Sequence, residues 1–145
     1  LWKTGDSIDI ILDMRIKAIK PTPYGSQVLM NEVIWGANYM IPTFDKEDEK
    51  AKYHLALIRG PIVLAQENRL GYSVDTPVDI NVNSDGYVDV ATPYETKAPY
   101  KNILELCVPL SDGTQMHVTD YASAGKLWTN DSKMAAWILT KTKQN

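Results

Sequence analysis

Hydrophobic and polar residues alternate along much of this chain, a pattern typical of β-strands with one buried face. The clearest example is Ser7 to Ile16, in which every second residue from Ile8 onward is apolar and only Ile11 falls out of phase. A period of two residues places the apolar side chains on one face of a strand. Turn-forming residues precede this stretch at Thr4-Gly5-Asp6, and two prolines follow it at Pro21 and Pro23. We therefore predict a strand at Ser7 to Ile16.

The stretch Lys52 to Glu67 predicts the centre of the core. Two apolar runs, Tyr53 to Ile58 and Ile62 to Ala65, flank the break Arg59-Gly60-Pro61. Both runs have the length of a strand and are too uniformly apolar for a surface helix. Glycine permits unusual backbone angles and proline removes a hydrogen-bond donor, so a regular ladder cannot run through the break. We expect two buried strands joined by a bend.

Further strands are predicted wherever short apolar runs flank turn signals. Asp-Gly pairs in the turn favour hairpins, and the predicted strands are Val78–Val82 with Tyr87–Ala91, Ile103–Val108 with Gln115–Thr119, and Met134–Leu139 at the end. About eight strands without a convincing helix predict an all-β fold. We expect residues 1–145 to form a single antiparallel β-sandwich domain, with a jelly roll as one open arrangement.

Composition and charge exclude several classes of function. The chain has 145 residues, 44% of them hydrophobic, and a net charge of −3 without a basic stripe, so we expect no nucleic-acid partner. Its apolar runs are all shorter than the roughly 20 residues that span a bilayer, so we expect no membrane partner.

Because the sequence starts at Leu1-Trp2, we interpret it as a segment of a longer protein. The single cysteine, Cys107, excludes an internal disulfide and predicts a buried structural thiol.

The segment Asn81 to Asp89 resembles the start of a calcium-binding loop. Such a loop places oxygen ligands at its first, third and fifth positions and glycine at its sixth, here Gly86. The first position is asparagine, and the twelfth, Thr92, is not the glutamate that binds calcium with both oxygens. Losing two carboxylates weakens a calcium site, so the sequence favours an ordinary hairpin, and we predict no metal and no cofactor.

Candidate catalytic groups do not form a recognisable pattern. Paired carboxylates could hydrolyse a glycosidic bond, and the available acids are Glu67, Glu95, Asp120 and Asp131. The spacing of these acids places no pair on one cleft, so we predict no catalytic residue. His54 and His117 each lie in an apolar strand, where they could pair across a sheet, but structural roles are the commoner use of such histidines. We expect the domain itself not to be an enzyme.

The long polar loop after the second hairpin combines aromatic and polar residues. Sugars stack their C–H faces on aromatic rings, while carboxylates and amides bind their hydroxyl groups. The candidate carbohydrate-binding residues are Asp120, Tyr121, Lys126, Trp128 and Asn130. Aromatic residues beside strands more often serve as core or interface anchors because they bury a large area. Both interpretations stay open, and the anchor role is the favoured one.

Three motifs give the chain a resemblance to a known family. They are Trp2-Lys3-Thr4-Gly5-Asp6 leading into the alternating stretch, Leu55 to Leu64 with its Arg-Gly-Pro break, and Val118 to Lys126 followed by Trp128, Asp131 and Ser132. The first two motifs resemble the β-rich segment that follows the (α/α) barrel in β-L-arabinofuranosidase-type glycoside hydrolases of family 127. The third is similar to a C-terminal module in bacterial relatives from gut Bacteroidetes.

The resemblance implies an accessory role. The family's catalytic machinery, a zinc-bound cysteine nucleophile with further cysteine ligands and glutamates, belongs to the barrel. Since this chain lacks the barrel and has one cysteine, no catalytic residue carries over. The resemblance implies a non-catalytic β-sandwich from a periplasmic or extracellular polysaccharide-degrading enzyme, with the catalytic barrel of the same parent chain as its partner. The alternative expectation is a carbohydrate-binding module that uses the Tyr121 to Trp128 loop.

Overall fold

The computed structural model describes residues 3–21, 33–34, 37–38, 49–90 and 95–144. These residues form β-strands, turns and two single-turn 3₁₀ helices, η1 (Ala51–Tyr53) and η2 (Asn68–Leu70), without an α-helix. The strands are β1 (Ile16–Ile19), β2 (Val33–Ile34), β3 (Ala37–Asn38), β4 (His54–Arg59), β5 (Ile62–Glu67), β6 (Tyr87–Val88), β7 (Glu105–Pro109), β8 (Gln115–Asp120), β9 (Met134–Ala135) and β10 (Trp137–Leu139). The prediction of an all-β fold is confirmed.

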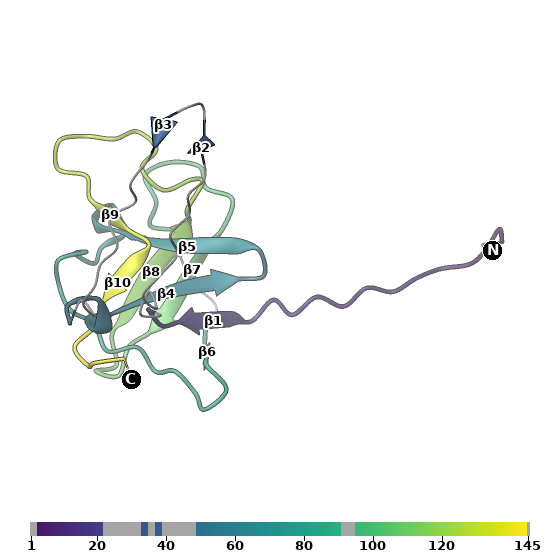
Figure 1. Cartoon of the computed structure of the whole chain (residues 1–145), viewed down its shortest axis with the longest axis horizontal. Helices are drawn as coiled ribbons and strands as arrows, with labels where there is room; N and C mark the ends of the chain where they lie inside the picture. The colour runs from purple at the N-terminus through teal and green to yellow at the C-terminus, as the bar shows by residue number, and fades with distance from the viewer. Residues whose placement is uncertain (1–2, 22–32, 35–36, 39–48, 91–94, 145) are drawn as a thin grey trace.

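The described strands form one curled antiparallel sheet and a small second one (Figure 1). Within the described residues, eight strands join in the large sheet, whose main path runs β6-β1-β4-β5-β8-β7, and β2 pairs with β3. All pairings between these strands are antiparallel. This curled arrangement is of the β-sandwich or half-barrel type, as the sequence predicts.

The central hairpin predicted from Lys52 to Glu67 is confirmed as β4 and β5. Arg59 pairs with Ile62 across the turn, and Gly60 takes a φ of +56°, the left-handed region in which glycine has no Cβ to clash. Beyond the turn the two strands separate: β10 pairs with the first half of β4, and β9 pairs with the last two residues of β5. The predicted last strand is thus two short strands that occupy the space between the diverging strands of the hairpin.

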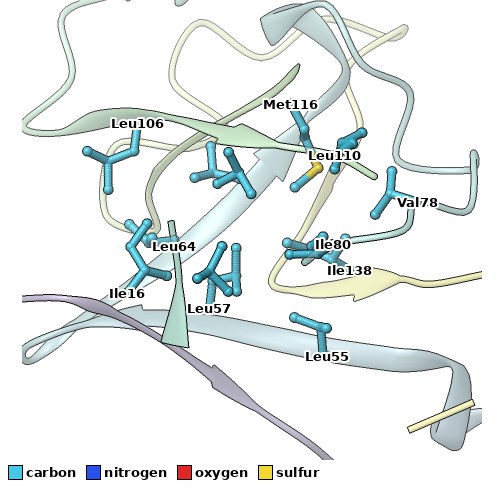
Figure 2. Packing of buried hydrophobic residues seen from close by; sticks show 13 residues of the cluster. Ile16, Leu55, Leu57, Leu64, Val78, Ile80, Leu106, Leu110, Met116 and Ile138 are labelled. Carbon is cyan, nitrogen blue, oxygen red and sulfur yellow. The ribbon is translucent and has the colours of Figure 1, made fainter. Parts of the chain in front are cut away.

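One apolar cluster fills the inside of the curled sheet. Its side chains are directed into a common space between the strands (Figure 2), and they come from Ile16, Leu55, Leu57, Leu64, Val78, Ile80, Val88, Leu106, Val108, Leu110, Met116, Val118 and Ile138. Residues 78–90 contribute Val78, Ile80 and Val88 to this cluster, and the segment is joined to the rest of the fold by isolated bridges from Val78 to Thr140 and from Ile80 to Leu110 and by the pairing of β6 with β1. Burial of apolar area in this cluster is the main force that holds the segment and the other strands together.

The predicted hairpin around Asp112-Gly113 is confirmed as β7 and β8, with Cys107 opposite His117. The hairpin around Asp85-Gly86 is confirmed only in part, because its pairing consists of the bridge from Val82 to Val88 and Ala91 lies outside the described residues. Cys107 is buried, as predicted, and its Sγ donates a hydrogen bond of 3.0 Å to Oε1 of Gln115.

The strand predicted at Ser7 to Ile16 is wrong, because β1 begins only at Ile16. Residues 7–15 form no ladder and lead away from the sheet as the long purple trace of Figure 1. The antiparallel partner of β1 explains this boundary. β4 ends at Arg59, which pairs with Ile16, and the chain then turns at Gly60, so β4 provides no backbone to pair with residues 7–15.

Candidate functional site

The loop that follows β8 presents the predicted carbohydrate-binding residues unevenly. Tyr121 and Trp128 expose 55% and 54% of their surface, and Lys126 and Asn130 are also exposed. Asp120, the last residue of β8, is instead buried. Four of the five residues can therefore reach a molecule in solution, and the carboxylate of the fifth cannot.

The Asp120 carboxylate holds two loops against the sheet. It accepts hydrogen bonds from the backbone N–H groups of Ile103 (3.0 Å), Leu104 (3.1 Å) and Ser123 (2.8 Å). Burial alone would raise the pKa of this carboxyl group, but the N–H donors around it keep the pKa below its ordinary value. Asp120 thus acts as an anchor for the backbone rather than as a ligand for sugar hydroxyls.

A buried ion pair fixes the next turn of the loop. Glu67 lies fully buried at the end of β5, and its carboxylate binds Nε and Nη2 of Arg69, the hydroxyl of Tyr100 and the backbone N–H of Gly125. Arg69 then donates from Nη1 to the carbonyl oxygen of Leu127 and from Nη2 to that of Lys126, both at 2.8 Å. The planar guanidinium group suits this role because its donors point in fixed directions.

The fixed turn displays two large apolar side chains. Leu127 has a φ of +54°, the one left-handed non-glycine residue among those described, and exposes 71% of its surface. A Cβ on Gly125 would lie 3.2 Å from Cε3 of Trp128, so the indole ring rests on a position that only glycine leaves open. Strained backbone of this kind persists where surrounding contacts enforce it and is concentrated at functional sites.

A third buried acid, Glu105, lies at the start of β7, the strand at the end of the main sheet path. Glu105 accepts hydrogen bonds from the backbone N–H groups of Lys97 (2.6 Å) and Ala98 (3.2 Å), from the side-chain amide of Asn102 (2.8 Å), and contacts Nδ1 of His117 (2.9 Å). Burial would raise the pKa of Glu105, but these contacts together lower it. Glu105 therefore ties residues 97–102 to β7.

Other candidate chemistry from the sequence is not assembled. His54 lies on β4 and binds the carbonyl oxygen of Lys50, while His117 lies on β8 beside Glu105, so the structure does not pair the two histidines. Burial raises the pKa of Cys107, which is unfavourable for a nucleophilic thiolate. In the part of the chain that the structure describes, no three His, Cys, Asp or Glu side chains could hold a metal ion together.

Two side-chain oxygen atoms of the calcium-like segment, those of Asn81 and Asn83, have partners within the protein. Oδ1 of Asn81 accepts a hydrogen bond from the Ser111 hydroxyl at 2.7 Å. Oδ1 of Asn83 accepts from the backbone N–H groups of Asp85 and Tyr87, as the asparagine of a hairpin turn does. These contacts agree with the hairpin interpretation of the segment.

Sequence reasoning missed the network around Glu67 and the role of Glu105. The signal available was an acidic residue inside an apolar run of strand length, since a buried carboxylate must find donors. The contribution of Tyr100 could not have been found in this way, because Tyr100 lies 33 residues from Glu67 in the sequence. Arg69 is only two residues from Glu67, but its bonds to the carbonyl oxygens of Lys126 and Leu127 depend on the tertiary fold.

Comparisons with known proteins give no relative for this chain. No family model, no curated protein and no solved structure matches it. A helix with the length and apolar character needed to cross a membrane is absent from the residues that the structure describes.

Proposed function

We propose that this chain is a non-catalytic accessory domain of a periplasmic or extracellular glycoside hydrolase, where it packs against and stabilises a catalytic (α/α) barrel of the same parent protein. The observation that carries this proposal is the exposed apolar segment before β1. Ile8, Ile10 and Leu12, which alternate along the segment, and Ile11 between them each expose 62% to 96% of their surface to solvent. Large apolar side chains gathered in one exposed segment indicate an interaction site, and the resemblance to family 127 suggests the barrel as the partner.

The contacts of the buried acids support a structural role. Glu67, Glu105 and Asp120 are the buried Asp and Glu residues among those described, and each binds donors from loops that cover the sheet. A general acid or nucleophile needs a carboxylate that faces substrate. These three carboxylates instead bind donors of the domain's own loops.

Hydrolysis assays test the proposal directly. The 145-residue chain is expected to release no product from aryl arabinofuranosides and related aryl glycosides, whereas the longer parent protein hydrolyses them. In the parent, Ile10→Asn combined with Leu12→Asn should lower the melting temperature of the barrel. Turnover by the 145-residue chain that disappears in Glu67→Gln or Glu105→Gln would overturn the proposal, as would a parent protein without a glycosidase barrel.

A carbohydrate-binding module is the second candidate, favoured by the fixed turn at Leu127 and Trp128. A rigid exposed indole loses little conformational entropy when a sugar ring stacks on it. The hydrogen bonds from Arg69 to the carbonyl oxygens of Lys126 and Leu127 provide this rigidity. Titration with arabinan and arabinoxylan should show binding that Trp128→Ala abolishes. Trp137→Ala is the matched control, since Trp137 is 48% exposed on β10, away from this turn in the sequence. Absence of binding to these polysaccharides would reject this candidate.

A further inference from the structure

Two exposed lysines border the fixed turn at residues 125–128 without an acidic partner. The ammonium group of Lys126 donates hydrogen bonds to the carbonyl oxygen of Lys101 at 3.3 Å and to the hydroxyl oxygen of Ser123 at 3.2 Å, and both acceptors are neutral. Within the part of the chain that the structure describes, neither Lys101 nor Lys126 forms an ion pair. An ammonium group has three donors, so Lys126 is held in place while one donor and its charge stay available to a ligand.

The acids close to this turn do not neutralise the charge of Lys126. The carboxylate of Asp120 is buried and accepts backbone N–H groups. Glu67 is paired with the guanidinium group of Arg69. Asp131 is exposed later in the same loop, and no ion pair joins it to Lys126. Positive charge that stays unpaired at the surface attracts anionic ligands.

The unpaired lysine and the exposed indole belong to one rigid piece of backbone. Trp128 follows Lys126 by two residues, so their Cα atoms are at most about 7 Å apart. Arg69 fixes the backbone between them, because it donates to the carbonyl oxygens of Lys126 and Leu127, both at 2.8 Å. A ligand that stacks on the indole therefore meets a cation whose position is already set, which lowers the entropic cost of binding.

We propose that this turn binds an acidic glycan, in which a sugar ring stacks on Trp128 and a carboxylate or sulfate group of the glycan pairs with Lys126. The inference rests on the second candidate function, carbohydrate binding, and specifies the class of glycan. A neutral glycan would cover the turn and leave the ammonium charge without a counter-charge. Lysine is a compact point charge without the planar fork of arginine, so it accepts either anionic group.

Calorimetric titration of the 145-residue chain with matched charged and neutral polymers tests the inference. One pair is polygalacturonate and its methyl ester, and the other is a sulfated galactan and its desulfated form. The chain should bind the charged member of at least one pair about fivefold more tightly, since this is close to the most that one exposed charge pair contributes. The pair that shows the preference identifies the anionic group.

Variants assign the preference to one side chain. Lys126→Met should remove the preference for the charged polymer, and Lys126→Arg should keep it. Lys17→Met is the matched control, because it removes the same charge from an exposed lysine on β1 and should leave the preference unchanged. Trp128→Ala should weaken the binding of charged and neutral polymers alike, because both stack on the indole.

Two results would overturn the inference and leave carbohydrate binding intact. The first is equal binding of the charged and the neutral member in both pairs, which is also expected if an acid elsewhere in the chain occupies Lys126. The second is a preference that Lys17→Met reduces as much as Lys126→Met does, because the overall charge of the chain would then explain it. If none of the polymers bound, the carbohydrate-binding candidate itself would be rejected. The accessory role is read separately, from the hydrolysis assays.

Discussion

Arg69 and Leu127 are 58 residues apart in the sequence, yet Nη1 of Arg69 donates a hydrogen bond of 2.8 Å to the carbonyl oxygen of Leu127. The same guanidinium group binds the buried carboxylate of Glu67. One side chain thus links the end of the central hairpin to the left-handed turn that displays Trp128. The geometry of the exposed turn depends on an ion pair that is nearly hidden from solvent.

Replacement of Arg69 by methionine should release this turn. Glu67 would keep its hydrogen bonds from Tyr100 and Gly125 but lose the positively charged partner that balances its carboxylate. Removing one partner of a buried ion pair costs roughly 3–5 kcal/mol in the free energy of unfolding. Urea denaturation measures this loss, and faster amide exchange at residues 125–128 would report the freed turn. Arg15→Met is the matched control, because its pair with Asp13 is exposed to water and therefore contributes little to the free energy of unfolding. If Arg69→Met and Arg15→Met lowered the free energy of unfolding equally, Arg69 would not hold the turn in the way we propose.

Acid should destabilise the domain through Glu105. The pKa of Glu105 is lower in the folded chain than its ordinary value of 4.5, so below that pH the unfolded chain binds more protons than the folded one. The free energy of unfolding therefore decreases as the pH falls from about 4.5 through the folded pKa. Asp120 adds to this loss from its ordinary value of 3.8 downward.

The variant Glu105→Gln tests this assignment. It should lower the free energy of unfolding at pH 7 by roughly 1–3 kcal/mol, because the N–H groups of Lys97 and Ala98 lose a charged acceptor. Between pH 5 and pH 3 its stability should fall less steeply than that of the unchanged protein. Glu95→Gln alters an exposed acid and should change the stability by about 0.5 kcal/mol or less. Parallel pH profiles for Glu105→Gln and the unchanged protein would place the acid sensitivity elsewhere.

The central hairpin could be predicted from the sequence because its information is local. A uniformly apolar run of strand length must be covered on both faces, and Gly60-Pro61 marks where the chain turns. The stretch from Ser7 has an equally good strand pattern, but alternation shows only that a segment suits a sheet. Whether a neighbouring strand pairs with residues 7–15 depends on where β4 ends, and the local sequence of residues 7–15 carries no information about that.

The sequence places the candidate binding residues around one loop, but it does not predict their contacts. Composition placed Tyr121, Trp128 and Asp120 in one loop, and the loop does expose both aromatic rings. The carboxylate of Asp120 turns inward because the backbone N–H groups of Ile103 and Leu104 must be satisfied when the neighbouring loop covers the sheet. Such a demand arises only from the tertiary fold, so a polar residue in a loop can be structural even beside exposed aromatic rings.

Leu57 provides the test of the core. It is fully buried in the middle of β4, so Leu57→Ala removes apolar contacts and leaves a cavity, which costs roughly 2–5 kcal/mol. Val63→Ala on the neighbouring strand is the control, since Val63 is partly exposed and should cost about 1 kcal/mol or less. Thermal or urea unfolding compares the two. A loss for Leu57→Ala no larger than that for Val63→Ala would show that the core lies elsewhere.

The turn at Gly60 allows the contact at the base of the N-terminal segment to be measured. Gly60→Ala forces a Cβ into left-handed backbone, which costs roughly 1–2 kcal/mol, and places it 3.0 Å from Sδ of Met14. Gly113→Ala carries the same kind of backbone cost at a position with open space around it. Gly60→Ala should therefore reduce the free energy of unfolding more than Gly113→Ala does. Combining Gly60→Ala with Met14→Ala should remove that excess, because the crowded sulfur is gone. If the larger loss of stability persisted in the double variant, the side chain of Met14 would not be what crowds the Cβ at residue 60.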